Sequence, residues 1–132
     1  FALVLLDVDG MRVINERLGR DGGHRLLADL GRLLQRELRA PDFVARYGGE
    51  EFLLLLPETD LDGARDTVHR IRERMEPAGL GELQLGVRCR LTAGVAVYPH
   101  AGVHRPEDLF ARVEAALLDG KAQDVDRIGS AA

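Results

Sequence analysis

The chain has 132 residues, of which 45% are hydrophobic and 30% are charged, and its formal net charge is −4. These values are typical of a single soluble globular domain that is large enough for a proper core. The acidic balance argues against broad electrostatic binding to nucleic acid, which leaves room only for a local basic patch.

The predicted elements begin with a strand at about residues 2–8, because residues 1–6 form an unbroken apolar run, as expected of a strand buried on both faces. A short helix is predicted at residues 11–18. A longer helix follows, because leucines recur on one face at helical spacing: Leu26, Leu27, Leu30, Leu33, Leu34 and Leu38. Two apolar runs joined by a short Gly-containing turn then predict a β-hairpin at residues 42–57.

The second half begins with a third amphipathic helix, whose apolar positions are Leu61, Ala64, Val68, Ile71 and Met75 and which Pro77 and Gly79 end. Residues 83–97 predict one or two strands, most clearly Cys89–Val97. Pro106 at a first helical position predicts a last helix that reaches Leu118. This order predicts an α+β fold, in which helices pack on one face of a central, mainly antiparallel sheet.

Carboxylates stand at two places suited to holding a ligand. Asp7 lies where the first strand emerges, and Glu50 and Glu51 follow the glycine pair Gly48-Gly49 at the hairpin tip. Glycines let a phosphate approach the backbone closely, and carboxylates beside them can bind a divalent cation. If the first strand pairs with the hairpin, Asp7 and Glu50 converge as in a metal-assisted phosphoryl-transfer site. The alternative is that Asp7 only ends a strand and Glu50 only decorates a turn.

Four ordered blocks carry a family resemblance that runs from Leu5 to about Lys121. They are Asp7-Val8-Asp9 with Ile14-Asn15 and Gly19; Arg39-x-x-Asp42 with Arg46-Tyr47-Gly48-Gly49-Glu50-Glu51-Phe52; Leu91-Thr92-Ala93-Gly94-Val95-Ala96; and Ala115-Ala116-Leu117 before Lys121. In these blocks the chain resembles the GGDEF domains, which are diguanylate cyclases, in the Gly-Gly-Glu-Glu-Phe variant. The resemblance implies one such domain over residues 1–132, with a ferredoxin-like core of the nucleotide-cyclase or polymerase-palm type.

The implied activity is the condensation of two GTP molecules into cyclic di-GMP, with loss of two pyrophosphates, across a homodimer. The resemblance assigns two Mg²⁺ ions to each active site, with Mn²⁺ as an alternative. Their ligands would be Asp7, Glu50, Glu51 and the backbone carbonyl of Val8. Asp7 and Glu50 would be the catalytic residues, and Glu50 is also the candidate for activating the attacking hydroxyl.

The same resemblance assigns residues to the nucleotide. Backbone amides around Gly10, Met11 and Arg12, together with Lys121, would hold the β- and γ-phosphates. Asn15 matches the guanine-reading asparagine, and His24 stands where its usual aspartate partner is expected. Gly48 and Gly49 complete the substrate site. Read without the family, Lys121 is a solvated surface residue and Asn15 makes a local backbone bond.

A second site is implied upstream of the hairpin. Arg39 and Asp42 occupy the position of the family's inhibitory product site, and Arg70 matches an additional arginine there. An arginine fork suits phosphate or a guanine edge, while an aspartate accepts from guanine N–H groups. The alternative for Arg39 and Asp42 is an ordinary surface salt bridge, which contributes little to stability.

Two departures from the family pattern support an alternative function. His24 replaces an aspartate, which puts guanine selectivity in doubt, and Val125 replaces a phosphate-binding arginine, with Arg127 two residues beyond. The alternative is a catalytically weak domain that binds GTP or cyclic di-GMP and regulates an attached module. A mere dimerisation module explains neither Asp7 nor the hairpin tip.

The remaining expectations concern the cellular setting. No run approaches the length of a transmembrane helix, no signal peptide is present, and the single cysteine, Cys89, favours a reducing compartment. The chain starts at Phe1 within a strand, so it is expected to be a fragment of a longer signal-transduction protein with a covalently attached sensor or regulatory domain. We expect a cytoplasmic location, including the cytoplasmic part of a membrane-anchored protein.

Overall fold

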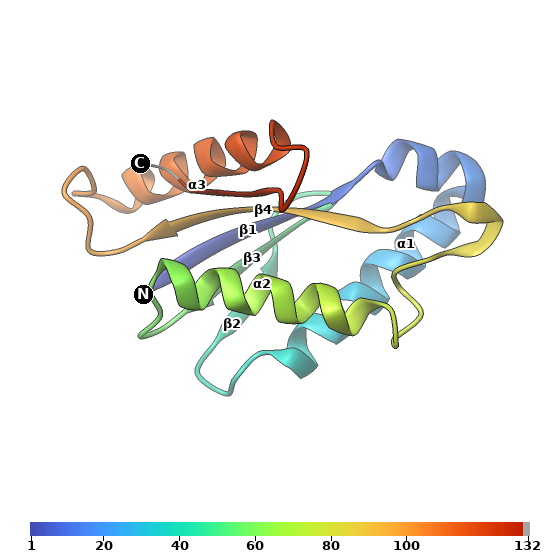
Figure 1. Ribbon diagram of the computed structural model, residues 1–132, viewed down its shortest axis with the longest axis horizontal. Coiled ribbons are helices and arrows are strands. Elements are labelled where there is room, and N and C mark those ends of the chain that lie inside the picture. The colour runs from blue at the N-terminus through green and yellow to red at the C-terminus, as the bar shows by residue number, and fades with distance from the viewer. Residues whose placement is uncertain (131–132) are drawn as a thin grey trace.

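The computed structural model describes residues 1–130, apart from the side chain of Leu85. Its centre is a five-stranded sheet in the order β2-β3-β1-β4-β5 (Figure 1). The strands are β1 (Ala2–Asp9), β2 (Phe43–Arg46), β3 (Glu51–Leu56), β4 (Arg90–Val97) and β5 (Ile128–Ser130). β1 is antiparallel to β3 and β4, whereas β5 is parallel to β4. The first four strands have the order 4-1-3-2 and the connectivity β-α-β-β-α-β, which confirms the predicted ferredoxin-like core.

The helices are α1 (Met11–Glu37), α2 (Leu61–Met75) and α3 (Pro106–Lys121), with a short 3₁₀ helix, η1 (Gln84–Gly86). Gly19 interrupts α1 with φ 77° and ψ 165°, so the two helices predicted over this stretch are present and joined at a kink. Asp60 begins α2 by accepting a hydrogen bond from the amide of Gly63 at 2.8 Å.

The helices cover both faces of the sheet, so the predicted packing on one face is wrong for α3. Val4 and Leu6 of β1 join a core with α1 and α2, while Leu3 and Leu5 join a second core with Val113 of α3. Figure 1 shows α3 on the opposite side of the sheet from α1 and α2. The physical reason lies in β1 itself: both of its alternating sets are apolar, so both faces must be covered.

Glycines bring α3 unusually close to the sheet. A Cβ at Gly94 of β4 would lie 2.6 Å from the carbonyl oxygen of Val113 and 2.8 Å from the Cα of Leu117. Gly129 of β5 likewise leaves no room for a side chain beside Ala116. This close packing sets the height of α3 over the sheet, and with it the position of Lys121 at the helix end.

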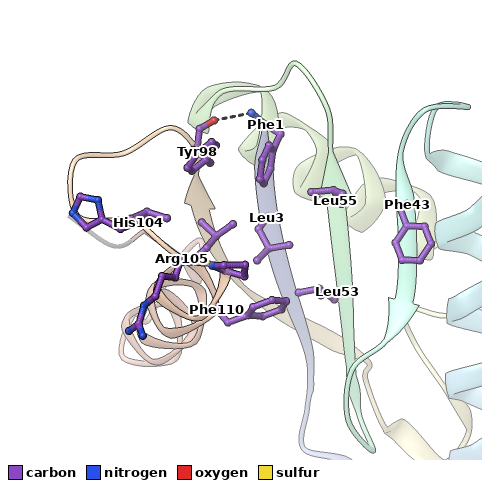
Figure 2. Close-up of a pocket in the computed structure, with 12 residues that line it drawn as sticks. Phe1, Leu3, Phe43, Leu53, Leu55, Tyr98, His104, Arg105 and Phe110 are labelled. Carbon is purple, nitrogen blue, oxygen red and sulfur yellow. Dashed lines mark hydrogen bonds between the residues drawn. The ribbon is translucent and has the colours of Figure 1, made fainter.

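α3 covers only part of its face. Beside it lies a groove of about 490 Å³, shown in Figure 2, whose walls include Leu3, Leu53, Leu55 and Phe110. Phe43 of β2, also on this groove, is 60% exposed. None of the predicted site residues lines it. Among the described residues, no helix has both the length and the apolarity needed to span a membrane.

Candidate active site at the ends of β1 and β3

The register of the sheet brings the two predicted acidic positions together. Asp7 is paired with Glu51 on one side, and the amide of Val8 donates to the carbonyl oxygen of Glu50 at 3.1 Å. The end of β1 therefore lies directly against the start of β3. On the other side Asp7 is paired with Thr92 of β4.

Asp7 is buried, with only 4% of its side chain exposed, and one of its oxygens forms an ion pair with the ammonium of Lys121. Its other oxygen, Oδ1, is buried and has no hydrogen-bond partner among residues 1–130. Buried polar atoms are nearly always satisfied, so this oxygen is expected to have a further partner. A hard divalent cation is such a partner, since it binds carboxylate oxygens.

Negative charge accumulates around Asp7. Burial, and next the charge of Asp7, raise the pKa of Glu50 and of Glu51, while Lys121 partly opposes the shift. The bond from Lys121 to Asp7 raises the pKa of the Lys121 ammonium, which keeps this group charged. Three carboxylates thus share one neutralising ammonium, an arrangement that a cation would relieve.

These residues fit a magnesium ion. Among residues 1–130, no three His, Cys, Asp or Glu side chains converge closely enough to hold an ion by themselves. Mg²⁺ is usually bound through one or two carboxylates plus substrate phosphates and waters. Asp7 and Glu50 supply two such carboxylates, so further ligands would come from substrate phosphates and water.

The hairpin tip is a tight turn held by its own backbone and by α3. The amides of Tyr47 and Gly48 donate to the carbonyl oxygen of Glu51 at 2.9 and 3.5 Å. A Cβ at Gly48 would lie 2.8 Å from Oε1 of Glu51, whereas a Cβ at Gly49 would meet no atom within 4 Å. The glycine pair therefore permits the turn at Gly48 and leaves open space at Gly49, beside Glu50.

An interaction that sequence reasoning missed ties this tip to α3. The hydroxyl of Tyr47 donates to Glu114 at 2.8 Å, and its ring stacks on Phe110 with centroids 6.1 Å apart. An exposed acid on a helix carries no signal for this hydrogen bond, because its partner is 67 residues away.

The start of α1 offers backbone donors next to Asp7. Gly10 has φ 70°, a left-handed conformation that favours glycine, and it turns the chain from β1 into the helix. No side chain caps this end, and the first turn holds no acidic residue. The first amides of a helix lack intrahelical acceptors and attract anions. Arg12 forms an ion pair with Glu16 at 3.4 Å and is otherwise exposed.

Asn15 and the segment before His24 lie together across the kink of α1. The side-chain oxygen of Asn15 lies so close over Gly23 that a Cβ there would overlap it. Asn15 and His24 are both exposed. Asn15 therefore lies against Gly23, the residue that precedes His24.

Arg39, Asp42 and Arg70 form a separate cluster. Arg39 grips Asp42 with two side-chain bonds, Nε to Oδ2 at 3.2 Å and Nη2 to Oδ1 at 2.9 Å. Burial tends to raise the pKa of Asp42, but the bonds from Arg39 outweigh it and hold the pKa below its ordinary value. Arg39 and Arg70 both line a groove of about 720 Å³, and Arg70 also donates to the carbonyl of Glu37 at 3.1 Å.

At the C-terminal end, the structure places two residues differently. Val125 occupies the position where the family has a phosphate-binding arginine, and Arg127 lies two residues beyond it. Val125 is 82% exposed. Arg127 turns inward, where it contacts Asp9 and Thr92. Thr92, a polar residue in the apolar run of β4, is the sequence signal that was available for this network.

Comparison with known proteins agrees with this geometry. The family model described as "Diguanylate cyclase, GGDEF domain" matches residues 1–127. The chain is 35% identical to the diguanylate cyclase DgcM of Escherichia coli over 97% of its own length, which is 30% of the length of DgcM. It therefore spans less than a third of this curated relative.

Two solved structures extend the likeness. The active GGEEF domain of a diguanylate cyclase from Vibrio cholerae has a TM-score of 0.83 and 28% identity, covering 99% of this chain and 82% of that one. The GGDEF domain of DgcB from Caulobacter crescentus in complex with c-di-GMP has a TM-score of 0.82 and 25% identity, covering 98% and 77%. With the match over residues 1–127, these likenesses show that the chain belongs to the GGDEF domain family of diguanylate cyclases.

Proposed function

We propose that this domain condenses two GTP molecules into cyclic di-GMP and two pyrophosphates. The observation that carries the proposal is Asp7, a buried carboxylate with an unsatisfied oxygen. It lies beside Glu50 and next to the start of α1, where triphosphate oxygens and a cation can meet.

Asp7, Glu50, Glu51 and the carbonyl of Val8 would hold two Mg²⁺ ions in each site, with Mn²⁺ as an alternative. When bound, these ions neutralise phosphate charge and align the reacting oxygens. Among the chain's own groups, Lys121 and the amides at Gly10, Met11 and Arg12 would hold the β- and γ-phosphates. Asn15 and His24 would contact guanine, and Gly48 and Gly49 leave space for the nucleotide.

In each half-reaction the 3′-oxygen of one GTP bonds to the α-phosphorus of the other, and the bond from that phosphorus to pyrophosphate breaks. The hydroxyl proton passes to Glu50, whose raised pKa suits a proton acceptor. One domain holds one GTP, so the reaction requires two domains facing each other. We therefore propose a homodimer as the catalytic unit.

Product binding is proposed for Arg39, Asp42 and Arg70. Two arginines on one groove suit the phosphates of cyclic di-GMP, and the Arg39–Asp42 fork leaves half of the Arg39 side chain exposed, at 53%. Binding there would inhibit the enzyme after product accumulates.

The wider setting is also a proposal. The chain spans 30% of DgcM, and so we propose that residues 1–132 form one domain of a longer cytoplasmic signalling protein. An attached sensor or regulatory domain would then control how two copies meet.

The test is turnover. The domain, fused to a dimeric coiled coil, is incubated with GTP and magnesium while cyclic di-GMP and pyrophosphate are followed. We expect product from the parent chain and none from Asp7→Asn or Glu50→Gln, because each change removes a charge that holds the ions. Glu73→Gln, the same change on an exposed part of α2, should keep activity.

A second candidate is a weak or inactive domain that binds GTP or cyclic di-GMP as a regulatory module. Two residues favour it. Val125 is 82% exposed and has no charge with which to bind a phosphate, and His24 replaces the aspartate expected to contact guanine. Absence of product from the parent chain, with guanine nucleotides still bound in calorimetry, would establish this function in place of the first.

A further inference from the structure

Arg127 joins three parts of the fold with one guanidinium group. Its Nε donates to Thr92 of β4 at 2.9 Å, and its Nη2 contacts Asp9 of β1 at 3.4 Å. Its Nη1 donates to the carbonyl oxygens of Lys121 and Gln123, at 3.2 and 3.0 Å, at the end of α3. The side chain is 30% exposed, so these bonds are partly shielded from water.

Asp9 is held from two sides. Thr92, whose exposure is 0%, lies 2.8 Å from both carboxylate oxygens of Asp9, and Arg127 approaches Oδ1. Asp9 is the last residue of β1 and is followed by Gly10, which turns the chain into α1. Whatever holds Asp9 therefore also holds the first turn of α1.

The backbone around Arg127 is strained. Asp126 and Arg127 have φ values of 69° and 51°, in the left-handed region that residues with a side chain rarely adopt. Such conformations persist where surrounding interactions over-determine them, and they cluster at functional sites. The side-chain bonds of Arg127 are interactions of that kind, as is the bond from the amide of Ala93 to its carbonyl oxygen at 3.0 Å.

We propose that Arg127 is a positioning residue for the nucleotide site. By bonding Asp9 and the carbonyls of Lys121 and Gln123, it sets the spacing between the two elements proposed to hold the triphosphate: the start of α1 and the Lys121 end of α3. This inference rests on the proposed function. Val125 has no charge with which to bind a phosphate. Arg127 instead holds Asp9 and the end of α3 in place and does not itself contact the phosphate.

The competing role is direct phosphate binding by Arg127. It would require the guanidinium to give up its bonds to Asp9, Thr92 and two carbonyls. The two roles differ in what Asp9 does. A positioning role needs Asp9 as much as Arg127, whereas direct phosphate binding does not.

The first experiment needs no nucleotide. Amide hydrogen exchange is measured on the free chain for Ile14, which donates to Gly10 at 3.0 Å, and Gln123, which donates to Gly120 at 3.2 Å. In both Arg127→Gln and Asp9→Asn we expect exchange at these amides to be faster by about tenfold, while the central strands stay protected. Arg88→Gln, which removes an exposed ion pair with Glu76 at 3.8 Å, should change neither amide. Unchanged exchange at Ile14 in Arg127→Gln would overturn the proposal.

The second experiment measures binding of a non-hydrolysable GTP analogue with magnesium by calorimetry. We expect Arg127→Gln and Asp9→Asn each to weaken binding by about tenfold, and the double variant to be no weaker than either, because all three variants disrupt the same network. Arg127→Lys, which can still reach Asp9, should recover part of the affinity. Weakening by Arg127→Gln alone, with Asp9→Asn unaffected, would establish direct phosphate binding instead. If the parent chain binds no analogue, the proposed function fails, and the exchange data still decide the role of Arg127.

Discussion

Lys121, the last residue of α3, forms an ion pair with Asp7, the buried carboxylate at the end of β1. It is the only lysine in the chain and lies 114 positions from its partner (121 − 7). The proposed metal ligand is therefore already bound by a cation of the protein. Any ion that binds Asp7 must compete with Lys121 or share the carboxylate with it.

Replacing Lys121 should reveal this competition. Lys121→Met leaves Asp7 buried and unpaired, so the free energy of unfolding should fall by about 1–2 kcal/mol, less than for a fully buried pair because Lys121 is 41% exposed. Magnesium should raise the melting temperature of this variant more than that of the parent chain, since Asp7 is freed. Thermal unfolding with and without magnesium measures both effects. Arg74→Met, which breaks a surface pair with Glu37 at 3.6 Å, is the control; equal magnesium shifts in all three proteins would contradict the competition.

Glu50→Gln should stabilise the metal-free domain while abolishing turnover. Although Glu50 as a whole is exposed, the surrounding protein partly desolvates its carboxyl group, and this desolvation, followed by the charge of Asp7, raises its pKa, so folding favours the protonated form. The contribution of the Glu50 carboxyl to the free energy of unfolding is fully present below the ordinary glutamate pKa. It is lost as the pH rises through the raised pKa of the folded state. The variant should therefore be more stable than the parent chain near pH 7 and no more stable near pH 4. The gain in the free energy of unfolding should be less than about 1 kcal/mol, because Glu50 is exposed. Chemical denaturation at the two pH values without metal tests this; an equal difference at both would refute it.

Arg39→Ala should weaken binding of cyclic di-GMP by about tenfold or more, because charge-assisted bonds to phosphate are removed. Isothermal titration with cyclic di-GMP is the measurement. Arg36→Ala, an exposed arginine in the last turn of α1, should bind like the parent chain. Unchanged affinity in Arg39→Ala would remove this groove as the product site.

Tyr47→Phe removes the bond to Glu114 and keeps the ring stacked on Phe110. We expect a loss of stability below about 1 kcal/mol, since Tyr47 is 42% exposed, and a larger proportional fall in kcat, because the hairpin tip carrying Glu50 is less fixed. Steady-state kinetics and thermal unfolding separate the two. Tyr98→Phe makes the same change on an exposed ring stacked with Phe1 and should leave kcat as it is; a matching fall there would show that the effect is not specific to the hairpin.

Gly94→Ala should be severely destabilising, by about 3 kcal/mol or more. Its new methyl group would lie 2.6 Å from the carbonyl oxygen of Val113, and helix backbone cannot move aside cheaply. Gly102→Ala, whose methyl group would lie 3.5 Å from the guanidinium of Arg112, is the matched control and should be tolerated. Chemical denaturation measures both. A mild effect at Gly94 would mean that α3 can lift from the sheet.

Local pattern was enough to identify most elements. The apolar run of β1, the hairpin around Gly48-Gly49 and the leucine spacing of α1 are properties of neighbouring residues, so the sequence itself predicts them. The kink at Gly19 was predicted as a break between two helices for the same reason. The family followed from ordered motifs, and the match over residues 1–127 confirms it.

Short-range spacing encodes the main strands and helices and the acidic motifs, which is why these could be predicted from the chain alone. Long-range packing placed α3 on the second face, added the three residues of β5 to the sheet, and brought Arg127 to Asp9 across 118 positions. These features depend on interactions between distant segments, for which neither periodicity nor composition carries a signal. The ion pair between Asp7 and Lys121 is another such feature. The sequence identifies both charged residues, but only the packing of α3 against the sheet brings Lys121 to Asp7.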